Sequence, residues 1–121
     1  MVKALFDTNI LIDYLNGIPA AREELDRYSE KAISIISWIE VMIGAPTHLA
    51  NATRTFLDTF DRIDITAEVA ERAVAIRGKF RIKLPDAIVW ASADVNAMLL
   101  VTRNTKDFPE DQPIIRIPYR L

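Results

Sequence analysis

Short, mostly apolar runs that alternate with helical patterns constrain the fold of this chain more than any other feature. These runs cover residues 2–6, 32–36 and 98–102, and shorter ones lie near Ile63 and Ile65 and at 114–117. Strands that are apolar throughout are typical of parallel sheets, because helices bury both faces of such a sheet. We therefore predict a three-layer α/β/α fold with a central parallel sheet of about four to five strands.

Apolar residues at helical spacing fill the segments between these runs. The expected helices start near Ile10, cover about 20–28, 37–44, 47–61 and 67–80, and resume at LPDAIVWASADVNA. Ser37 and Glu40 have the spacing of a capping box, so we expect Ser37 to cap its helix and fix Glu40. Trp38 and Trp90 lie on apolar helical patterns, which favours a place in the core or at a dimer contact over stacking on bases.

Composition narrows both the architecture and the chemistry. The chain has 121 residues, half of them hydrophobic, and this length suits one domain over residues 1–121. It has no cysteine and one histidine, His48, which argues against thiolate ligands, cysteine nucleophiles and a histidine-built zinc site. No apolar run reaches the roughly 20 residues of a membrane span, and no secretory leader is recognisable, so we expect a cytoplasmic protein without a membrane partner.

Acidic residues follow the carboxyl ends of three expected strands. Asp7 comes directly after the first, Glu40 one turn past the second, and the segment TRNTKD, with Asp107, after the third long strand. In parallel sheets these ends share one edge, where ligands bind. Each acid also has a simpler interpretation. Asp7 or Thr8 suits the cap of the first helix, and Asp86 suits the first turn of a later helix. Glu40 suits the capping box, and Asp107 suits a turn.

Carboxylates gathered at one edge repel one another and need a compensating cation. Without histidine or cysteine, oxygen ligands match a hard divalent ion, Mg²⁺ or Mn²⁺, which keeps room for water and phosphate oxygens. Such an ion supports hydrolysis of a phosphodiester by metal-activated water. Ser37 and Ser92 have no histidine partner, so we do not expect a covalent intermediate.

Four segments carry a more specific signal: ALFDTNILIDYL, SIISWIEVMIG, LPDAIVWASA and LLVTRNTKDF. In this order and at these separations they resemble the PIN-domain family, and specifically the small VapC-type ribonuclease toxins of prokaryotic toxin–antitoxin (VapBC) pairs. The resemblance covers nearly the whole chain and implies that the three α/β/α layers form a PIN-like domain. It implies an endoribonuclease that depends on Mg²⁺ or Mn²⁺, forms a homodimer and is held inactive by a VapB-like antitoxin.

The resemblance also implies which residues form the site. Asp7, Glu40 and Asp86 match three of the family's four catalytic, metal-binding acids. At the fourth position many members have an aspartate where this chain has Asn104, and Asp107 follows three residues later. Both are expected among the metal ligands, with Asp107 supplying the missing catalytic charge. The residues expected to support these ligands are Thr8, Asn9, Ser37 and Thr102.

Basic residues gather locally although the net charge is −2. From Arg72 to Lys83 the chain has five basic residues and no acidic one. This pattern fits either a solvated helix face or a phosphate-contacting patch. For a ribonuclease, the residues expected to contact RNA phosphates are Arg77, Arg81, Lys83, Arg103 and Lys106. Arg103 and Lys106 also suit a second role, which is to balance the carboxylates.

Other functions fit the sequence less well. A phosphoaspartate enzyme of the haloacid-dehalogenase type needs an aspartate where Asn9 stands. A receiver domain needs an acidic pair beside the first strand and a lysine after the last. A catalytically weak or inactive PIN-like module, which binds RNA or a protein partner without cleavage, is favoured only by Asn104.

Overall fold

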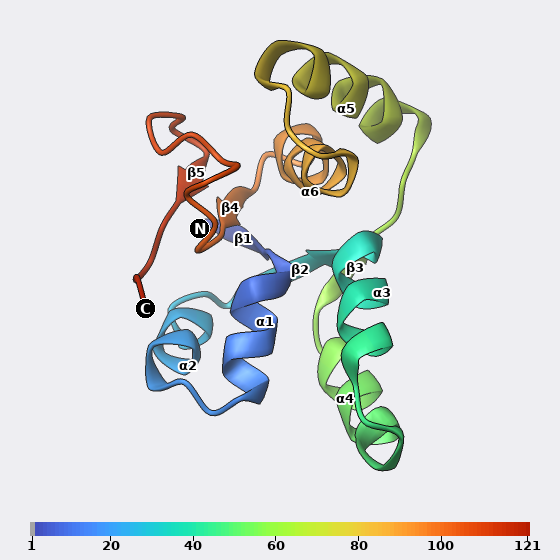
Figure 1. The fold of residues 1–121 in the computed structure, drawn as a ribbon, viewed down its shortest axis with the longest axis vertical. Helices are drawn as coiled ribbons and strands as arrows, with labels where there is room; N and C mark the ends of the chain where they lie inside the picture. The colour runs from blue at the N-terminus through green and yellow to red at the C-terminus, as the bar shows by residue number, and fades with distance from the viewer. Residues whose placement is uncertain (1) are drawn as a thin grey trace.

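The computed structural model describes residues 2–121. Within this range five strands form one parallel sheet in the order β3-β2-β1-β4-β5 (Figure 1). The strands are β1 (Lys3–Phe6), β2 (Glu30–Ser34), β3 (Asp61–Ile63), β4 (Leu99–Val101) and β5 (Ile115–Arg116). The arrangement confirms the predicted α/β class and places β1 at the centre of the sheet.

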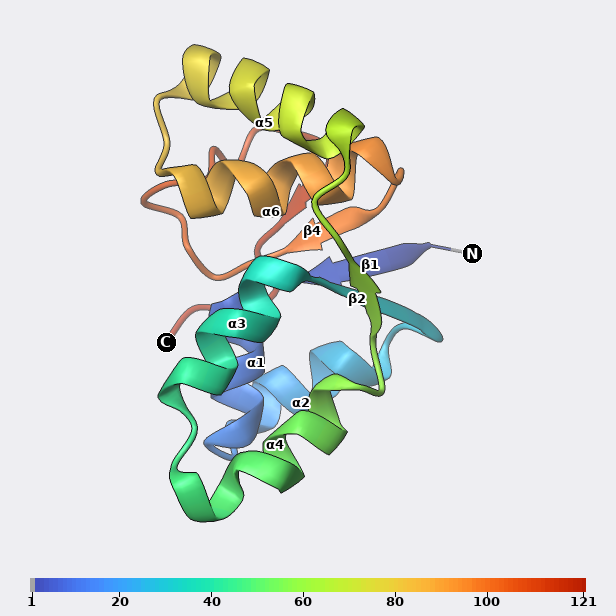
Figure 2. The ribbon, with the colours of Figure 1, turned by 90° about the vertical axis from the view of Figure 1, so that its right-hand side faces the viewer.

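Helices cover both faces of the sheet (Figures 1 and 2). Those on one face are α1 (Thr8–Leu15), α2 (Pro19–Asp26), α3 (Ile35–Gly44) and α4 (Ala50–Leu57), with a short 3-10 turn, η1 (Thr47–Leu49), before α4. The other face carries α5 (Ala67–Phe80) and α6 (Leu84–Val95). Across residues 2–121, no helix has the length and apolar character needed to cross a membrane.

The alternation of side chains along each strand divides the core into two clusters. Leu5 of β1 points into the cluster under α5 and α6, which also contains the buried Trp90. Phe6, the next residue, points into the cluster under α1, α2 and α4, against which Trp38 packs. Both tryptophans therefore contribute to the core, as their positions in the sequence predicted.

The second strand ends earlier than predicted. β2 stops at Ser34, and α3 begins at Ile35, because the Ser34 hydroxyl accepts a hydrogen bond of 3.1 Å from the N–H of Ile36. Ser34 is therefore the N-cap of the helix. The predicted capping box of Ser37 and Glu40 is wrong, since Ser37 lies inside the helix rather than before it.

The segment predicted as one helix over 47–61 is divided. The 3-10 turn η1 precedes α4, which ends at Leu57, and the chain then enters β3 at Asp61. Leu57 and Phe60 are both buried in the cluster under α4. The helix therefore ends before the apolar pattern of the sequence ends, because the chain pairs with β2 from Asp61 onward. Ile65 lies beyond this strand and is exposed.

An ion pair fastens the last strand to α2. Arg116 of β5 contacts Glu24 with both ends of its guanidinium group, Nε at 2.7 Å from Oε2 and Nη2 at 3.0 Å from Oε1. The Tyr28 hydroxyl donates a third hydrogen bond to Oε2 at 3.0 Å. The Glu24 side chain is 4% exposed and that of Arg116 is 32% exposed. Because β5 has only two residues, these side-chain contacts supply much of its attachment.

We expect Glu24→Gln to lower the free energy of unfolding by about 2 kcal/mol, because Arg116 and Tyr28 then donate to a neutral amide instead of a charged carboxylate. The loss is limited because water still reaches part of the Arg116 side chain. Urea denaturation at neutral pH measures this loss. The exposed neighbour Glu23 supplies the control, Glu23→Gln, which should change stability little. Equal stability of the two variants would show that the pair contributes nothing net.

Candidate active site

The carboxyl ends of the central strands bring together residues that are distant in the sequence. Asp7 follows β1 directly, and Thr102 follows β4, which pairs with β1. Glu40 lies on α3, the helix that starts at the end of β2. Asp86 lies in the first turn of α6. The predicted meeting of strand ends is therefore the origin of the site.

Asp7 is held by three hydrogen bonds. Its Oδ1 accepts from the N–H of Thr8 at 2.8 Å, which makes Asp7 the N-cap of α1. Its Oδ2 accepts from the Thr102 hydroxyl at 2.8 Å and from Asn9 Nδ2 at 3.1 Å. A carboxylate has about four acceptor positions, so about one is left for a ligand. The capping and ligand interpretations of Asp7 are thus compatible.

Thr8 orients Glu40. The Thr8 hydroxyl lies 2.6 Å from Glu40 Oε1 and 3.0 Å from the Ser37 hydroxyl. An ionised carboxylate can only accept, so Thr8 gives its single proton to Glu40, and the proton of Ser37 completes the second contact. Ser37 is buried on the face of α3 toward α1. It therefore supports Glu40 through Thr8 rather than as a helix cap.

Asn104 holds Asp107, whose charge acts on Asp86. The Asn104 amide donates to Asp107 Oδ2 at 2.9 Å, and its carbonyl oxygen accepts from the Asp107 N–H at 3.2 Å. Burial raises the pKa of Asp86, and the negative charges of Asp107 and Glu40 raise it further, while Lys83 lowers it. Both ends of the Asn104 amide group are therefore bonded to Asp107. This arrangement favours Asp107, rather than Asn104, as the fourth member of the acidic set.

Asp7 has the strongest electrostatic perturbation among these acids. Its pKa is raised from the usual 3.8 to about 6, mainly by burial. The hydrogen bonds from Thr102 and Thr8 lower the pKa, and the charges of Asp86 and Glu40 raise it. The ionised form is therefore costly unless a cation is near. The candidate ligands together carry up to four negative charges on a small part of the surface, at Asp7, Glu40, Asp86 and Asp107.

The acids fit an ion that keeps part of its water. Across residues 2–121, no three carboxylate or imidazole groups lie close enough together to enclose a metal by themselves. Mg²⁺ is usually held by one or two carboxylates, with water and substrate phosphate at the remaining positions. An oxygen-only donor set in which the pKa values of Asp7 and Asp86 are raised suits this kind of loose site better than a closed protein cage.

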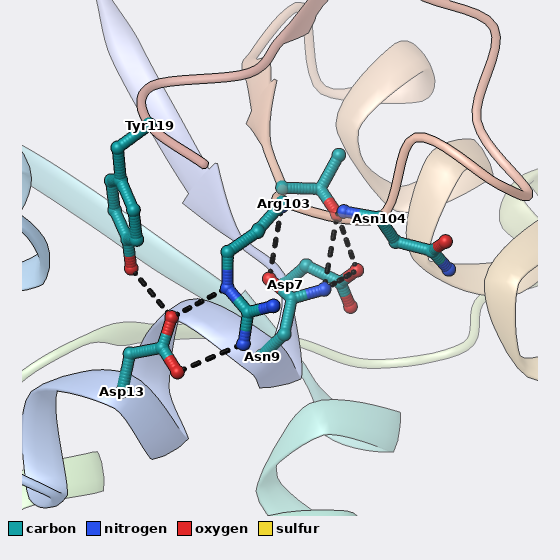
Figure 3. Close-up of polar contacts among 7 residues, drawn as sticks. Asp7, Asn9, Asp13, Arg103, Asn104 and Tyr119 are labelled. Atoms are coloured by element: carbon teal, nitrogen blue, oxygen red, sulfur yellow. Dashed lines mark hydrogen bonds and ion pairs between the residues drawn. The ribbon is translucent and has the colours of Figure 1, made fainter. Parts of the chain in front are cut away.

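The predicted basic residues do not all lie free at the surface. The guanidinium group of Arg103 is paired with Asp13, through Nε at 2.7 Å and Nη2 at 2.9 Å (Figure 3). In contrast, four predicted phosphate contacts are exposed: Arg77, Arg81, Lys83 and Lys106. Sequence analysis missed Asp13 and Tyr119, whose side chains meet at 2.8 Å. The sequence contained one indication that Asp13 lies near the site: it follows Asn9 by one helical turn and so shares its helix face.

We expect the stability of the metal-free protein to fall as the pH rises from about 4 to 7, by about 3 kcal/mol from Asp7 alone. The folded state binds the extra proton in this range because its Asp7 pKa is about 6 rather than 3.8, so deprotonation favours unfolding. In Asp7→Asn this part of the pH dependence should disappear.

Chemical denaturation in EDTA at several pH values measures the slope of the free energy of unfolding against pH. A substitution that changes stability by the same amount at every pH leaves this slope unchanged. Asp58→Asn, at an exposed position after α4, is the matched control and should keep the wild-type slope. If Asp7→Asn kept the same slope as Asp58→Asn, Asp7 would not carry the perturbed pKa.

Comparison with known proteins agrees with this geometry. Residues 4–110 match the family described as PIN domain. The protein named Ribonuclease VapC10 of Mycobacterium tuberculosis is 32% identical over 113 residues, which cover 87% of this chain and 85% of that protein.

Two solved structures are also similar over almost their full length. A toxin-antitoxin complex from Klebsiella pneumoniae contains a chain that is 46% identical, with a TM-score of 0.94 over 98% of this chain and 100% of that chain. The DNA-bound VapBC from Salmonella typhimurium contains a chain that is 26% identical, with a TM-score of 0.78 over 97% of each chain.

Proposed function

The chain belongs to the PIN-domain family, and we propose that it is a metal-dependent endoribonuclease, the toxin of a VapBC-type toxin–antitoxin pair. The observation that carries this proposal is that Asp7, Glu40 and Asp86 lie near one another at the carboxyl edge of a parallel sheet. Their negative charges repel there, and a bound cation would relieve the repulsion. The names of the similar proteins, a ribonuclease and the toxin-antitoxin complexes, support the same function.

Asp7, Glu40, Asp86 and Asp107 would hold the ion, Mg²⁺ or Mn²⁺, in part through its bound water, because no three of them lie close enough together to enclose it. When bound, such an ion activates water for attack on a phosphodiester and neutralises the charge that builds on the phosphate. Asp7 would offer its one free acceptor position, in an orientation fixed by Thr102, and Glu40 would be oriented by Thr8. Asn104 serves this set indirectly, because it holds Asp107.

The exposed basic residues would bind RNA. Arg77, Arg81 and Lys83 lie at the end of α5 and in the turn before α6, next to the helix start that carries Asp86. Lys106 lies in the segment after β4, beside Asp107. We place phosphate contacts on these four residues and not on Arg103, because the guanidinium group of Arg103 is paired with Asp13.

We place the antitoxin on an apolar groove of about 260 Å³ between α1, α3 and η1. Ile12, Leu15 and Leu49 line the groove, and each is more than 40% exposed although large and apolar. A groove of this kind accommodates the apolar face of an amphipathic helix. The similarity to a chain of a toxin-antitoxin complex supports a protein partner of this type.

A second copy of the chain would cover a different apolar surface. Val74 of α5, Leu84 at the start of α6 and Ile65 before α5 are all exposed, and they lie around one shallow groove. Apolar side chains gathered in this way mark surfaces that associate with other proteins. We assign this surface to the homodimer contact, apart from the groove assigned to the antitoxin.

Cleavage of a mixed-sequence RNA pool tests the proposed reaction. With Mg²⁺ or Mn²⁺ the purified protein should cut RNA, and with EDTA it should not. Asp86→Asn should lower the rate about a thousandfold, because a metal ion contributes several kcal/mol to the reaction and each 1.4 kcal/mol is a factor of ten.

Asp58→Asn is the matched control and should keep wild-type activity. The competing function is a PIN-like module that binds RNA or a protein without cleavage. A folded wild-type protein that binds RNA but never cuts it, with either metal, would favour that module over the nuclease.

The basic residues give a separate prediction for affinity. Joint substitution of Arg77, Arg81 and Lys83 by alanine should weaken RNA binding and make the slope of log affinity against log salt shallower by about 2, since each phosphate contact contributes about 0.7. Binding is best measured in the Asp86→Asn background, where RNA stays intact. An unchanged slope would remove these residues from the RNA-binding surface.

A further inference from the structure

We propose that Arg103 is a positioning residue for the Asp7 carboxylate, and that Asp13 and Tyr119 hold Arg103 in place. The C-terminal tail would then take part in organising the site. This inference rests on the function proposed above, because it concerns the orientation of a metal ligand. It also gives Arg103 a role different from the phosphate contact predicted by the sequence.

Arg103 fastens the segment after β4 to α1 at two points. Its backbone N–H donates to Asn9 Oδ1 at 3.0 Å, and its guanidinium group makes the two-point contact with Asp13. Asn9 and Asp13 are one turn apart on the same face of α1. Two attachments along one helix fix both the position of this segment and its rotation against the helix.

Asp13 is a suitable anchor because it is buried. Only 5% of the residue is exposed, and a buried carboxylate is costly unless it is fully paired. Arg103 Nε and the Tyr119 hydroxyl both donate to the same oxygen, Oδ2, at 2.7 and 2.8 Å (Figure 3). Tyr119 lies in the tail that follows β5, so the end of the chain completes the pairing of an α1 side chain.

Asn9 and Thr102 connect Arg103 to the Asp7 carboxylate. Asn9, which accepts from the Arg103 N–H, donates to Asp7 Oδ2 at 3.1 Å. Thr102, the residue before Arg103, donates to the same oxygen at 2.8 Å. Both donors to Oδ2 therefore depend on where Arg103 holds the segment.

The other oxygen of Asp7 is held locally. Its Oδ1 accepts from Thr8 N–H, the next residue in the chain. A shift of the Arg103 segment would thus release one side of the carboxylate and leave the other in place. The group could then rotate, and its free acceptor position would no longer point in a fixed direction. Weaker metal binding and slower cleavage follow from this loss of orientation.

The chain contains a matched control for this arrangement. Glu24, Arg116 and Tyr28 form a second set of acid, arginine and tyrosine, with the same two-point contact and the same tyrosine hydrogen bond. The exposed fractions also match, 32% and 4% for Arg116 and Glu24 against 32% and 7% for Arg103 and Asp13. Glu24 lies on α2, which contributes none of the candidate ligands.

The experiment compares Asp13→Asn with Glu24→Gln in the full chain. Mn²⁺ affinity is measured by calorimetry in the absence of RNA, and kcat and KM are measured separately for RNA cleavage. Asp13→Asn should weaken Mn²⁺ binding and lower kcat, each about tenfold, with KM for RNA unchanged. Glu24→Gln should keep the wild-type values of all three, although it also loses stability.

Tyr119→Phe and Tyr28→Phe repeat the comparison with milder changes, and decide the matter if Asp13→Asn does not fold. Tyr119→Phe should shift Mn²⁺ affinity and kcat in the same direction by a smaller factor, and Tyr28→Phe should not. If the variants near Arg103 matched their controls in Mn²⁺ affinity and kcat, the contacts would only stabilise the fold, and the inference would fail.

A direct phosphate contact by Arg103 would give a different result. Asp13→Asn would then change KM for RNA while Mn²⁺ affinity and kcat stayed at the wild-type values, which also overturns the inference. Failure of the proposed function is distinguishable from both results, because the wild-type protein itself would then neither bind Mn²⁺ through Asp7 nor cut RNA.

Discussion

The buried carboxylate of Asp7 is the constraint on which the rest of the site depends. It lies at the end of the central strand, where burial and two other acids disfavour its charge. Three hydrogen bonds make the ionised group tolerable, and they come from the start of α1 and from the residue after β4. The strand order places these donors next to one another, because β4 pairs directly with β1.

The acids are concentrated at the cost of stability, and the surrounding structure compensates for it. Proteins commonly keep such unfavourable arrangements at functional sites and balance them elsewhere. Two ion pairs with buried carboxylates, Arg103 with Asp13 and Arg116 with Glu24, attach the segments after β4 and at β5 to α1 and α2.

The sheet and most of the helices could be predicted from the sequence because they follow from local patterns. Asp7, Glu40 and Asp86 each come shortly after a strand or at a helix start, so the topology of a parallel sheet places them on one edge. The start of α3 was harder to predict, since Ser34 and Ser37 are both suitable caps. Ile35 and Ile36, which lie between them, suit a buried strand as well as a helix. Arg103 was harder still, because its partner Asp13 is 90 residues away and has no local signal of pairing.

The central position of β1 also determines when the protein can become active during its synthesis. Thr102 and Asp7 are 95 residues apart, and Tyr119 and Asp13 are 106 residues apart, yet both pairs are in contact. A chain that leaves the ribosome from its N-terminus presents Asp7 and Glu40 long before β4 exists to complete the sheet beside β1. Chains that have not yet reached Thr102 therefore lack the oriented carboxylate, and the site can assemble only after β4 has been synthesised.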